Sequence, residues 1–540
     1  MSSFQAPSQK YGIFAAITIL ILGPALTIFQ DGLTVLGDRS FWFSLYGWLT
    51  TGIVVGYIVY LTFYCLGLIK SDSADLSDSD KSPSQPKTPR SAGKLPAWEE
   101  EDLPPPPPFN LRNALGIVGP GAILLGTSIG SGEWLLGPAV TSEYGGFLLW
   151  LVPVSIVLQV IINTEFIRYT MYTGEPVYTG FMRTNPGPRF WGIFYIIAAF
   201  LQLSWPGWAS AAATALTALY IGDFPTSEHI GLIKTFGFIW FLSTTVIVIF
   251  GEKIEQTIEL IQWFFIAAIL LFLLFVTGVF TSPDTWNAAA KGLTYFGVLP
   301  PGLDWVIISA FIADAGAGGV INATIGNWFR DKGLAMGQAV GYIPAIIGGR
   351  KVPLTKTGKI FPLTPKNKRS WRNWWKFVSV DQYGIWAIGC FLGMLLPALI
   401  TLEFVPYGTR FDNEFGIAVY QAQYMSLATG NHIFWLIILL IGFWILYSTQ
   451  LGVTDAFVRM VTDIIWSGSS RIRRWRGGDI RFVYYGVLFL FTLWGLFILL
   501  LDVKPLLLIL IGANIAGINF AFLGLHILYI NRKFLPIELR

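Results

Sequence analysis

Apolar runs of about 20 residues recur along nearly the whole chain, and they constrain its fold more than any other feature. Each run is long enough to cross a hydrocarbon core roughly 30 Å thick. A backbone inside lipid must satisfy its own hydrogen bonds, so the runs are predicted to be membrane helices. Of the 540 residues, 54% are hydrophobic and only 13% are charged. We therefore expect an all-α polytopic membrane protein that is neither an enzyme nor a partner of nucleic acid.

The chain divides into three predicted segments. Residues 1–70 carry two apolar runs and are predicted to form an N-terminal two-helix transmembrane hairpin rather than a cleaved signal peptide. Residues 71–110 are rich in Ser, Asp, Lys and Pro, which predicts a disordered cytoplasmic linker. Residues 111–540 are predicted to form a core of ten helices, giving about 12 transmembrane helices in all. The core helices are expected at about 113–139, 145–168, 190–221, 231–250, 256–280, 302–328, 382–403, 433–455, 482–502 and 505–530.

Basic residues support this helix count. If the chain changes sides at each helix and the linker is cytoplasmic, 31 of the 36 Lys and Arg residues fall on the cytoplasmic side, as the positive-inside rule requires. The five on the outer side are Arg39, Lys234, Lys291, Arg410 and Lys504. We expect both termini in the cytoplasm and the protein in the cytoplasmic membrane of a bacterium.

Two core helices are predicted to be interrupted, at corresponding positions of two inverted repeats. The glycines expected in the unwound segments are Gly130 and Gly132 in the first helix and Gly316, Gly318 and Gly319 in the second. Interrupted helices at matching places in two halves point to a transport site. Because each half has five helices, the two halves must be inverted relative to each other. We expect the repeats at about 111–280 and 301–530.

Two acidic residues, Glu133 and Asp314, lie within or beside these glycine segments. A carboxylate at the centre of a membrane helix costs about 2.5 to 3.5 kcal/mol, so it is seldom there without a function. With the carbonyls freed by unwinding, the acids predict an oxygen-rich site for a divalent cation such as Mg²⁺, Mn²⁺ or Ca²⁺. Two facing carboxylates also repel each other, so the empty site would tend to hold a proton. The candidate ligands are Glu133, Asp314, Gly130, Ser131, Ala313 and Asn514.

Structural roles remain open for the same residues. The glycines could serve close helix packing. Glu133 could stabilise the start of the half-helix that follows it, and Asp314 could pair with a buried Asn or Ser. Asn514 could serve either function or helix–helix hydrogen bonding. Glu165 and Arg168, near the cytoplasmic end of the second core helix, are predicted to form a structural ion pair.

Four short motifs of the core belong to the pattern of a known transporter family. Gly119-Pro120-Gly121 opens the first broken helix, and the second core helix ends with Arg168-Tyr-Thr-Met-Tyr-Thr173-Gly174. A short turn, 251–255, precedes the fifth helix, and the eighth contains Ser448-Thr449. From about residue 113 onward the chain thus resembles the Nramp family of divalent-metal transporters. The resemblance implies a LeuT-like fold of two inverted five-helix repeats and divalent-metal transport by alternating access.

The binding motifs depart from the family pattern. The family's Asp-Pro-Gly-Asn falls on Gly130-Ser131-Gly132-Glu133, where only the glycine is kept. Its Met-Pro-His falls on Ala313-Asp314-Ala315, so the thioether and the imidazole are both missing. The family's soft methionine sulfur is associated with a preference for transition metals. Its loss implies a divergent branch with a harder oxygen site.

Three functions fit the sequence. The first is a secondary-active transporter or facilitator of divalent metal cations. The second is a transporter of an amine, amino acid or other organic solute on the same fold, with Trp134, Trp205 and Trp208 as candidates for cation–π contacts. The third is a non-transporting membrane sensor or scaffold. The two cysteines lie in apolar runs and imply no disulfide or metal centre, so no cofactor is expected beyond the transported cation. The ion, its coupling to protons and the oligomeric state stay open.

Overall fold

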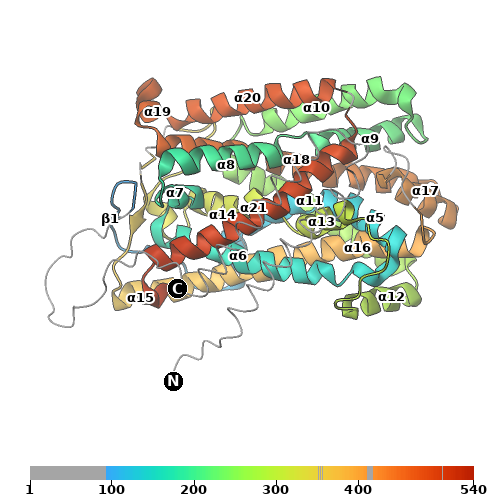
Figure 1. Cartoon of the computed structure of the whole chain (residues 1–540), viewed down its shortest axis with the longest axis horizontal. Coiled ribbons are helices and arrows are strands. Elements are labelled where there is room, and N and C mark those ends of the chain that lie inside the picture. The colour runs from blue at the N-terminus through green and yellow to red at the C-terminus, as the bar shows by residue number, and fades with distance from the viewer. Residues whose placement is uncertain (1–92, 351, 353, 356, 410–416, 502) are drawn as a thin grey trace, which may run out of the picture. The chain divides into compact units, whose positions relative to one another are not determined.

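The computed structural model describes residues 93–540 apart from 351, 353, 356, 410–416 and 502. The predicted N-terminal hairpin and most of the predicted linker lie outside the described residues. Within the described part the chain is largely helical, and its one sheet pairs two short parallel strands, β1 (Glu99–Glu100) and β2 (Lys359–Ile360). Figure 1 shows the long helices running side by side, with the last one, α21 (Pro505–Phe534), crossing them obliquely.

Helices of the first half run from residue 111 to residue 294. They are α3 (Leu111–Ile117), α4 (Pro120–Ser128), the π-helix η1 (Gly132–Leu136), α5 (Gly137–Tyr144), the 3₁₀ turn η2 (Gly145–Leu148), α6 (Leu151–Thr173), α7 (Val177–Met182), α8 (Pro188–Leu203), α9 (Gly207–Ile221), the 3₁₀ turn η3 (Ser227–His229), α10 (Ile230–Ile247), α11 (Ile254–Phe280) and α12 (Pro283–Thr294).

Helices of the second half begin at residue 305. They are α13 (Trp305–Asp314), α14 (Gly319–Lys332), the 3₁₀ turn η4 (Ala335–Ala339), α15 (Pro365–Ser379), the π-helix η5 (Val380–Ala387), α16 (Ile388–Phe404), α17 (Ile417–Thr429), α18 (Ile433–Gly468), α19 (Ser470–Arg474), the 3₁₀ turn η6 (Trp475–Gly477), α20 (Ile480–Leu500), α21 and the 3₁₀ turn η7 (Ile537–Leu539).

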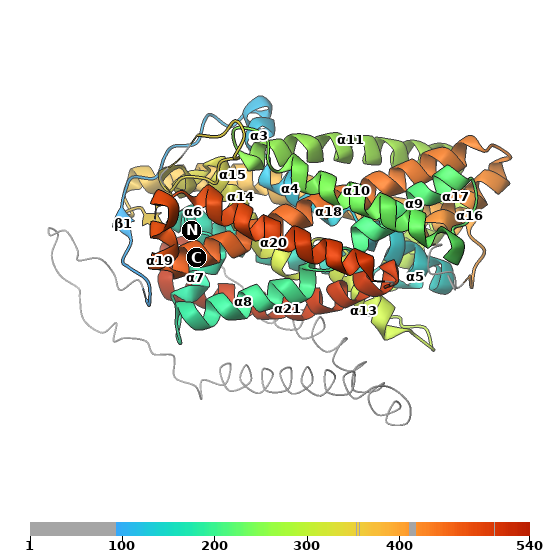
Figure 2. The ribbon, with the colours of Figure 1, turned by 90° about the horizontal axis from the view of Figure 1, so that it is seen from above.

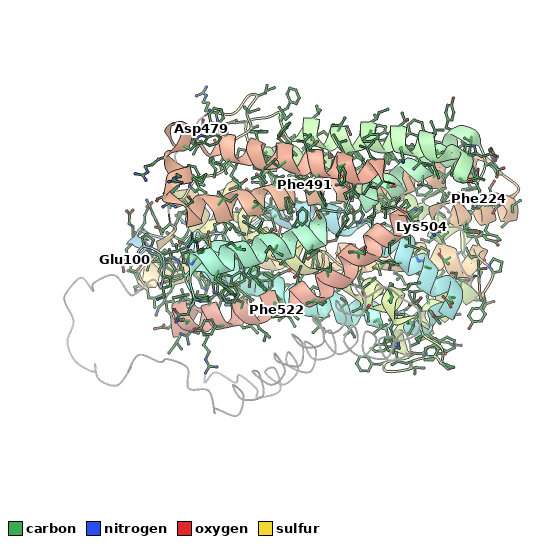
Figure 3. The ribbon with its side chains drawn as sticks, turned by 45° about the horizontal axis from the view of Figure 1, so that its top comes forward. Glu100, Phe224, Asp479, Phe491, Lys504 and Phe522 are labelled. Atoms are coloured by element: carbon green, nitrogen blue, oxygen red, sulfur yellow. The ribbon has the colours of Figure 1, made fainter. Side chains whose placement is uncertain are left out.

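Nine spans in the described residues are long and apolar enough to cross a membrane. The first predicted core helix is not one of them, because it is divided into α4, η1 and α5. Glu100 and Asp479, from segments predicted to be cytoplasmic, lie at one end of the bundle in Figure 3, whereas Phe224 and Lys504, from predicted outer loops, lie toward the other. We call these the linker end and the far end.

Three predicted helices differ from the structure in extent. The third is interrupted at Ser204–Pro206, because Pro206 has no backbone N–H to continue the helix. The seventh begins at Pro365 rather than near residue 382, since the basic segment is itself helical and passes through η5 into α16 without a break. The eighth continues as α18 to Gly468, beyond the predicted end at 455, and its last turns contact α14 and α7 rather than lipid.

The core is built around α18, which packs against α4, α9, α11 and α20. Every residue of α4 is buried, and α14 is buried from Gly319 to Asp331. In contrast, α11 and α20 carry large apolar side chains on their outer faces, such as Leu271 and Phe489. Figure 2 shows α11 along one face of the bundle. Helices exposed in this way have the lipid-facing surface of a membrane protein. Their inner faces pack against the core. Phe491 of α20, labelled in Figure 3, stacks on Phe457 of α18.

A buried ion pair anchors the linker end. Glu175, between α6 and α7, accepts hydrogen bonds from Arg183 Nε (2.8 Å), Tyr169 Oη (2.7 Å) and the backbone N–H of Gly358 (2.8 Å). Burial alone would raise the pKa of Glu175, but the Arg183 guanidinium and the other donors more than offset it, so the pKa is lowered. Arg183 also donates to the carbonyl of Pro96 and lies over the ring of Trp98 at 4.2 Å. The described part of the predicted linker is thereby attached to the bundle.

We expect the Glu175→Gln variant to lose about 3 kcal/mol of unfolding free energy at neutral pH, because it leaves a buried guanidinium without its counter-ion. The folded-state pKa of Glu175 lies below its ordinary value of 4.5. Its stabilising contribution is therefore complete above 4.5 and is lost as the pH falls through the lower value. Denaturation of the purified protein at several pH values measures both effects. The control is Glu101→Gln, which removes a half-exposed ion pair with Lys359 and should cost less than about 1 kcal/mol. A Glu175→Gln profile that parallels the wild type would contradict this account.

Candidate functional site

The first predicted core helix, called helix 1 from here on, loses its winding between α4 and η1. Ile129 is extended at ψ 91°, and the helix resumes at Ser131. Thr449 of α18 donates to the carbonyl of Ile129 (3.0 Å), and the carboxylate of Glu133 accepts the N–H of Gly130 (2.8 Å). A glutamate that reaches back to the N–H preceding its own helix is half of a capping box. The structural role left open for Glu133 is therefore the contact that the structure shows.

Gly130 is required by what lies against it. A Cβ atom added there would meet Thr449 Oγ1 at 2.3 Å. The contact joins the interruption of helix 1 to α18, the centre of the core. The interruption is followed by the π-helix η1, in which the N–H of Gly137 bonds to the carbonyl of Gly132. π-Helical turns of this kind are frequent at functional sites.

The sixth predicted core helix, called helix 6 from here on, is interrupted between α13, which ends at Asp314, and α14, which begins at Gly319. Residues 315–318 are outside regular helix, so their carbonyls are available for other partners. Gly318 and Gly319 have φ of +68° and +54°, a left-handed conformation that glycine adopts without strain. The predicted glycine segment is thus where the helix unwinds.

Two glutamine side chains hold this interruption from either side. Gln159 of α6 accepts the N–H of Gly318 (3.2 Å) and donates to the carbonyl of Ala313 (3.4 Å). Gln202, the penultimate residue of α8, accepts the N–H of Val320 (3.0 Å) and donates to the carbonyl of Gly318 (3.2 Å). Both side chains are buried. They replace the intrahelical partners that the unwound backbone has lost.

The two interruptions touch each other at Asp314. A Cβ atom added to Gly132 would lie 2.2 Å from the carbonyl oxygen of Asp314. The Ser131 hydroxyl donates to the Asp314 carboxylate (2.7 Å), and the indole N–H of Trp208, from α9, donates to the same hydroxyl (3.0 Å). The Asp314 residue is only partly buried. The pairing of Asp314 with a serine, left open by the sequence, is therefore present and comes from the other broken helix.

Glu133 does not share this arrangement. It is completely buried, and its side chain lies beside Gly393 of α16, where an added Cβ would be 3.4 Å from Glu133 Cγ. Glu133 is bonded to its own backbone and Asp314 to Ser131, so each acid is held by a different donor. Within the described part of the chain, no three His, Cys, Asp or Glu side chains group so as to hold a metal ion. A cation at this site would depend on Asp314 and on carbonyl or hydroxyl oxygens.

The remaining predicted residues lie around the site or away from it. Asn514 of α21 donates to the carbonyls of Val306 and Leu510 and accepts the Ser309 hydroxyl, which links α21 to α13. Arg168 and Glu165 form an ion pair at 3.2 Å, away from both interruptions.

Of the three tryptophans predicted for cation–π contacts, only Trp208 reaches the site. Trp134 packs against Gly442 of α18, and the indole N–H of Trp205, between α8 and α9, donates to the carbonyl of Leu201 in α8.

Sequence reasoning missed the polar side chains that hold the interruptions. Gln159 and Gln202 each lie inside a predicted membrane helix, where an amide needs a partner. Asn322 of α14 donates to both Gln159 and Asn163, which extends the same network along α6. Uncharged amides inside apolar runs could have indicated these side chains as partners of unwound backbone. Pro206, four residues after Gln202, was a second signal in the sequence.

Solved structures of a manganese transporter are similar to this bundle. A mutant of the manganese transporter of Eremococcus coleocola matches with a TM-score of 0.50 and 13% identity over 72% of each chain. The same transporter with an aromatic bis-isothiourea compound matches with a TM-score of 0.50 and 14% identity over 73% of each chain. No family model matches the chain, and no curated protein matches its sequence. The similarity confirms the predicted polytopic, LeuT-like fold.

We expect Gly130→Ala to lower the unfolding free energy by about 1–3 kcal/mol, because the new methyl group collides with Thr449. In the Gly130→Ala, Thr449→Ala double variant the colliding hydroxyl is gone, so its destabilisation should be smaller than the sum of the two single effects. Thermal unfolding of the purified variants measures all three. Gly278→Ala on α11 is the matched control, since nothing lies within 4 Å of its added Cβ. Equal effects of the substitutions at Gly130 and Gly278 would refute the packing argument.

Proposed function

We propose that this protein is a secondary transporter that moves divalent metal cations by alternating access, with Asp314 as the central ligand. The observation that carries the proposal is the Asp314 carboxylate, partly exposed at the unwound end of α13 and oriented by Ser131 from the other broken helix. A carboxylate beside unwound carbonyls is the ligand type that hard cations prefer. The fold similarity to a manganese transporter supports the choice of cargo class.

Alternating access fits the way the two interruptions are joined. Ser131 and Asp314 lie at the ends of half-helices that belong to different repeats, so movement of one repeat against the other would alter the ligand shell. Because Ala313 and Ala315 flank Asp314, the segment offers a cation oxygen atoms and no sulfur or imidazole nitrogen. The proposed site therefore favours Mg²⁺ or Mn²⁺ over soft ions such as Cd²⁺.

We expect Asp314→Asn to reduce Mn²⁺ and Mg²⁺ uptake into proteoliposomes at least tenfold, because the neutral amide cannot balance a divalent charge. A tenfold loss corresponds to about 1.4 kcal/mol of binding. Asp284→Asn is the control, since Asp284 is exposed on α12. Glu133→Gln should have the smaller effect of the two acids, because the amide oxygen can still accept the N–H of Gly130. Metal uptake that is unchanged in the Glu133→Gln, Asp314→Asn double variant would reject the proposal.

A second candidate cargo is an organic solute that carries an ammonium group. It is favoured by the partly exposed carboxylate of Asp314 and by the Trp208 ring. The indole N–H of Trp208 donates to the Ser131 hydroxyl, which donates in turn to that carboxylate. A carboxylate next to an aromatic ring is a common environment for an organic cation.

Thermal stabilisation of the purified protein by Mg²⁺, Mn²⁺, Ca²⁺, Cd²⁺ and a panel of amines and amino acids separates the two cargo classes. For metal transport we expect stabilisation by Mn²⁺ and Mg²⁺ that grows with concentration and is lost in Asp314→Asn. Stabilisation by amines with none by any metal would select the second candidate. Trp208→Phe should then weaken the amine effect, since it removes the hydrogen bond to Ser131.

A further inference from the structure

Two glutamates at the start of α11 lie side by side at the linker end. Glu259 is fully engaged, because both of its carboxylate oxygens accept hydrogen bonds from the ammonium of Lys332 at 2.7 and 2.6 Å. Glu255, one turn earlier, is 1% exposed, and neither of its carboxylate oxygens has a hydrogen-bond donor among the described residues. An ionised carboxylate buried without any donor is costly. The burial of the Glu255 carboxyl group is therefore not explained by hydrogen bonds to its neighbours.

The charged groups around Glu255 are already committed to other partners. Lys332 of α14 is bonded to Glu259, and Arg459 of α18 is bonded to Asp455 and Asp331. Asp381 of η5 accepts the backbone N–H of Gly121 (3.0 Å) and the Gln382 amide. Together with Glu255 and Asp381, the ion pairs of these cations and of Arg330 comprise six carboxyl groups and three cations. They are Glu255, Glu259, Asp331, Asp381, Asp455 and Asp463 with Arg330, Lys332 and Arg459. Acid is in excess, and Glu255 is the member without a donor.

The start of α4 lies against Glu259 and its partner Lys332. A Cβ atom added to Gly119 would lie 2.1 Å from Lys332 Nζ and 2.4 Å from Glu259 Oε2, so any larger residue there would push these two paired side chains aside. Gly121, two residues later, would collide with Asp381. The Gly119-Pro120-Gly121 motif thus does more than open the broken helix. It brings α4 into contact with the charged groups of α11, α14 and η5.

A proton fits this position better than a metal ion. The ammonium of Lys332 already occupies the oxygens of Glu259, and it would repel a second cation. Two ionised carboxylates offer only acceptors, so Glu255 can bond to the neighbouring Glu259 only if one of the two carries a proton. Protonation also removes the charge that has no counter-ion.

We infer that Glu255 is a proton-binding site, which takes a proton from water at the linker end and must hold it while its carboxyl group is buried. A movement that exposes the carboxyl group to water would let it release the proton again. Closure of the linker end is then coupled to proton uptake. The link between this proton and cargo movement rests on the proposed transport function, whereas the protonation itself does not.

Infrared spectroscopy of the full-length purified protein tests the inference without any cargo. The wild-type spectrum minus that of Glu255→Gln should contain the carbonyl band of a protonated carboxylic acid, and the band should fade as the pH is raised. Glu165→Gln is the matched control, since Glu165 is paired with Arg168 and should leave the band unchanged. Lys332→Gln removes the nearest cation, so the band should persist to higher pH.

A second measurement does not depend on band assignment. If the folded protein must hold the Glu255 proton, its melting temperature should fall as the pH rises, and Glu255→Gln should flatten that fall because the amide needs no proton. A wild-type spectrum identical to that of Glu255→Gln at every pH, or equal pH profiles of melting, would overturn the inference. If the wild-type protein shows the acid band but takes up no Mn²⁺ in proteoliposomes, the result would count against the transport function and not against the proton site.

Discussion

A helix that unwinds inside a membrane exposes backbone groups that lipid cannot satisfy, and the site depends on how this protein meets that constraint. In helix 1 a hydroxyl from α18 and the carboxylate of Glu133 satisfy the interrupted backbone. In helix 6 the amides of Gln159 and Gln202 do so. Without these buried donors and acceptors the broken segments would rewind or move apart, and Asp314 would have no fixed position beside Ser131.

The number of hydrogen-bond donors around each buried acid separates acids with a structural role from those that can bind a cation or a proton. Glu175 has a guanidinium, a phenol and a backbone N–H around it, so its charge is fully balanced. Asp314 has one hydroxyl, and Glu255 has no donor among the described residues. A carboxylate with spare acceptor capacity in a low-dielectric region favours a cation or a proton. The two proposals place a metal cation at Asp314, deep between the broken helices, and a proton at Glu255, where helix 1 begins.

Much of this arrangement was readable in the sequence, and particular residues show where the reading stopped. Glycine content located both interruptions, because Gly318 and Gly319 adopt backbone angles that other residues avoid. The interruption between α8 and α9 was missed, since the long apolar run was read as one continuous helix in spite of Pro206. The prediction that Glu133 and Asp314 face each other was drawn from their positions within or beside the two glycine segments. In the structure Glu133 accepts the N–H of Gly130, a contact that the sequence left open as one of two roles for this residue.

The sequence by itself determined the membrane-spanning architecture and the two glycine-rich places where helices break, because both follow from local properties: the length of apolar runs and the backbone freedom of glycine. Only the tertiary structure decided which polar groups meet. Ser131 and Asp314 are 183 positions apart, and Gln159 reaches helix 6 across a similar separation. Such contacts depend on how two repeats pack against each other, so the partner of each buried acid could be assigned only once the helices were in place.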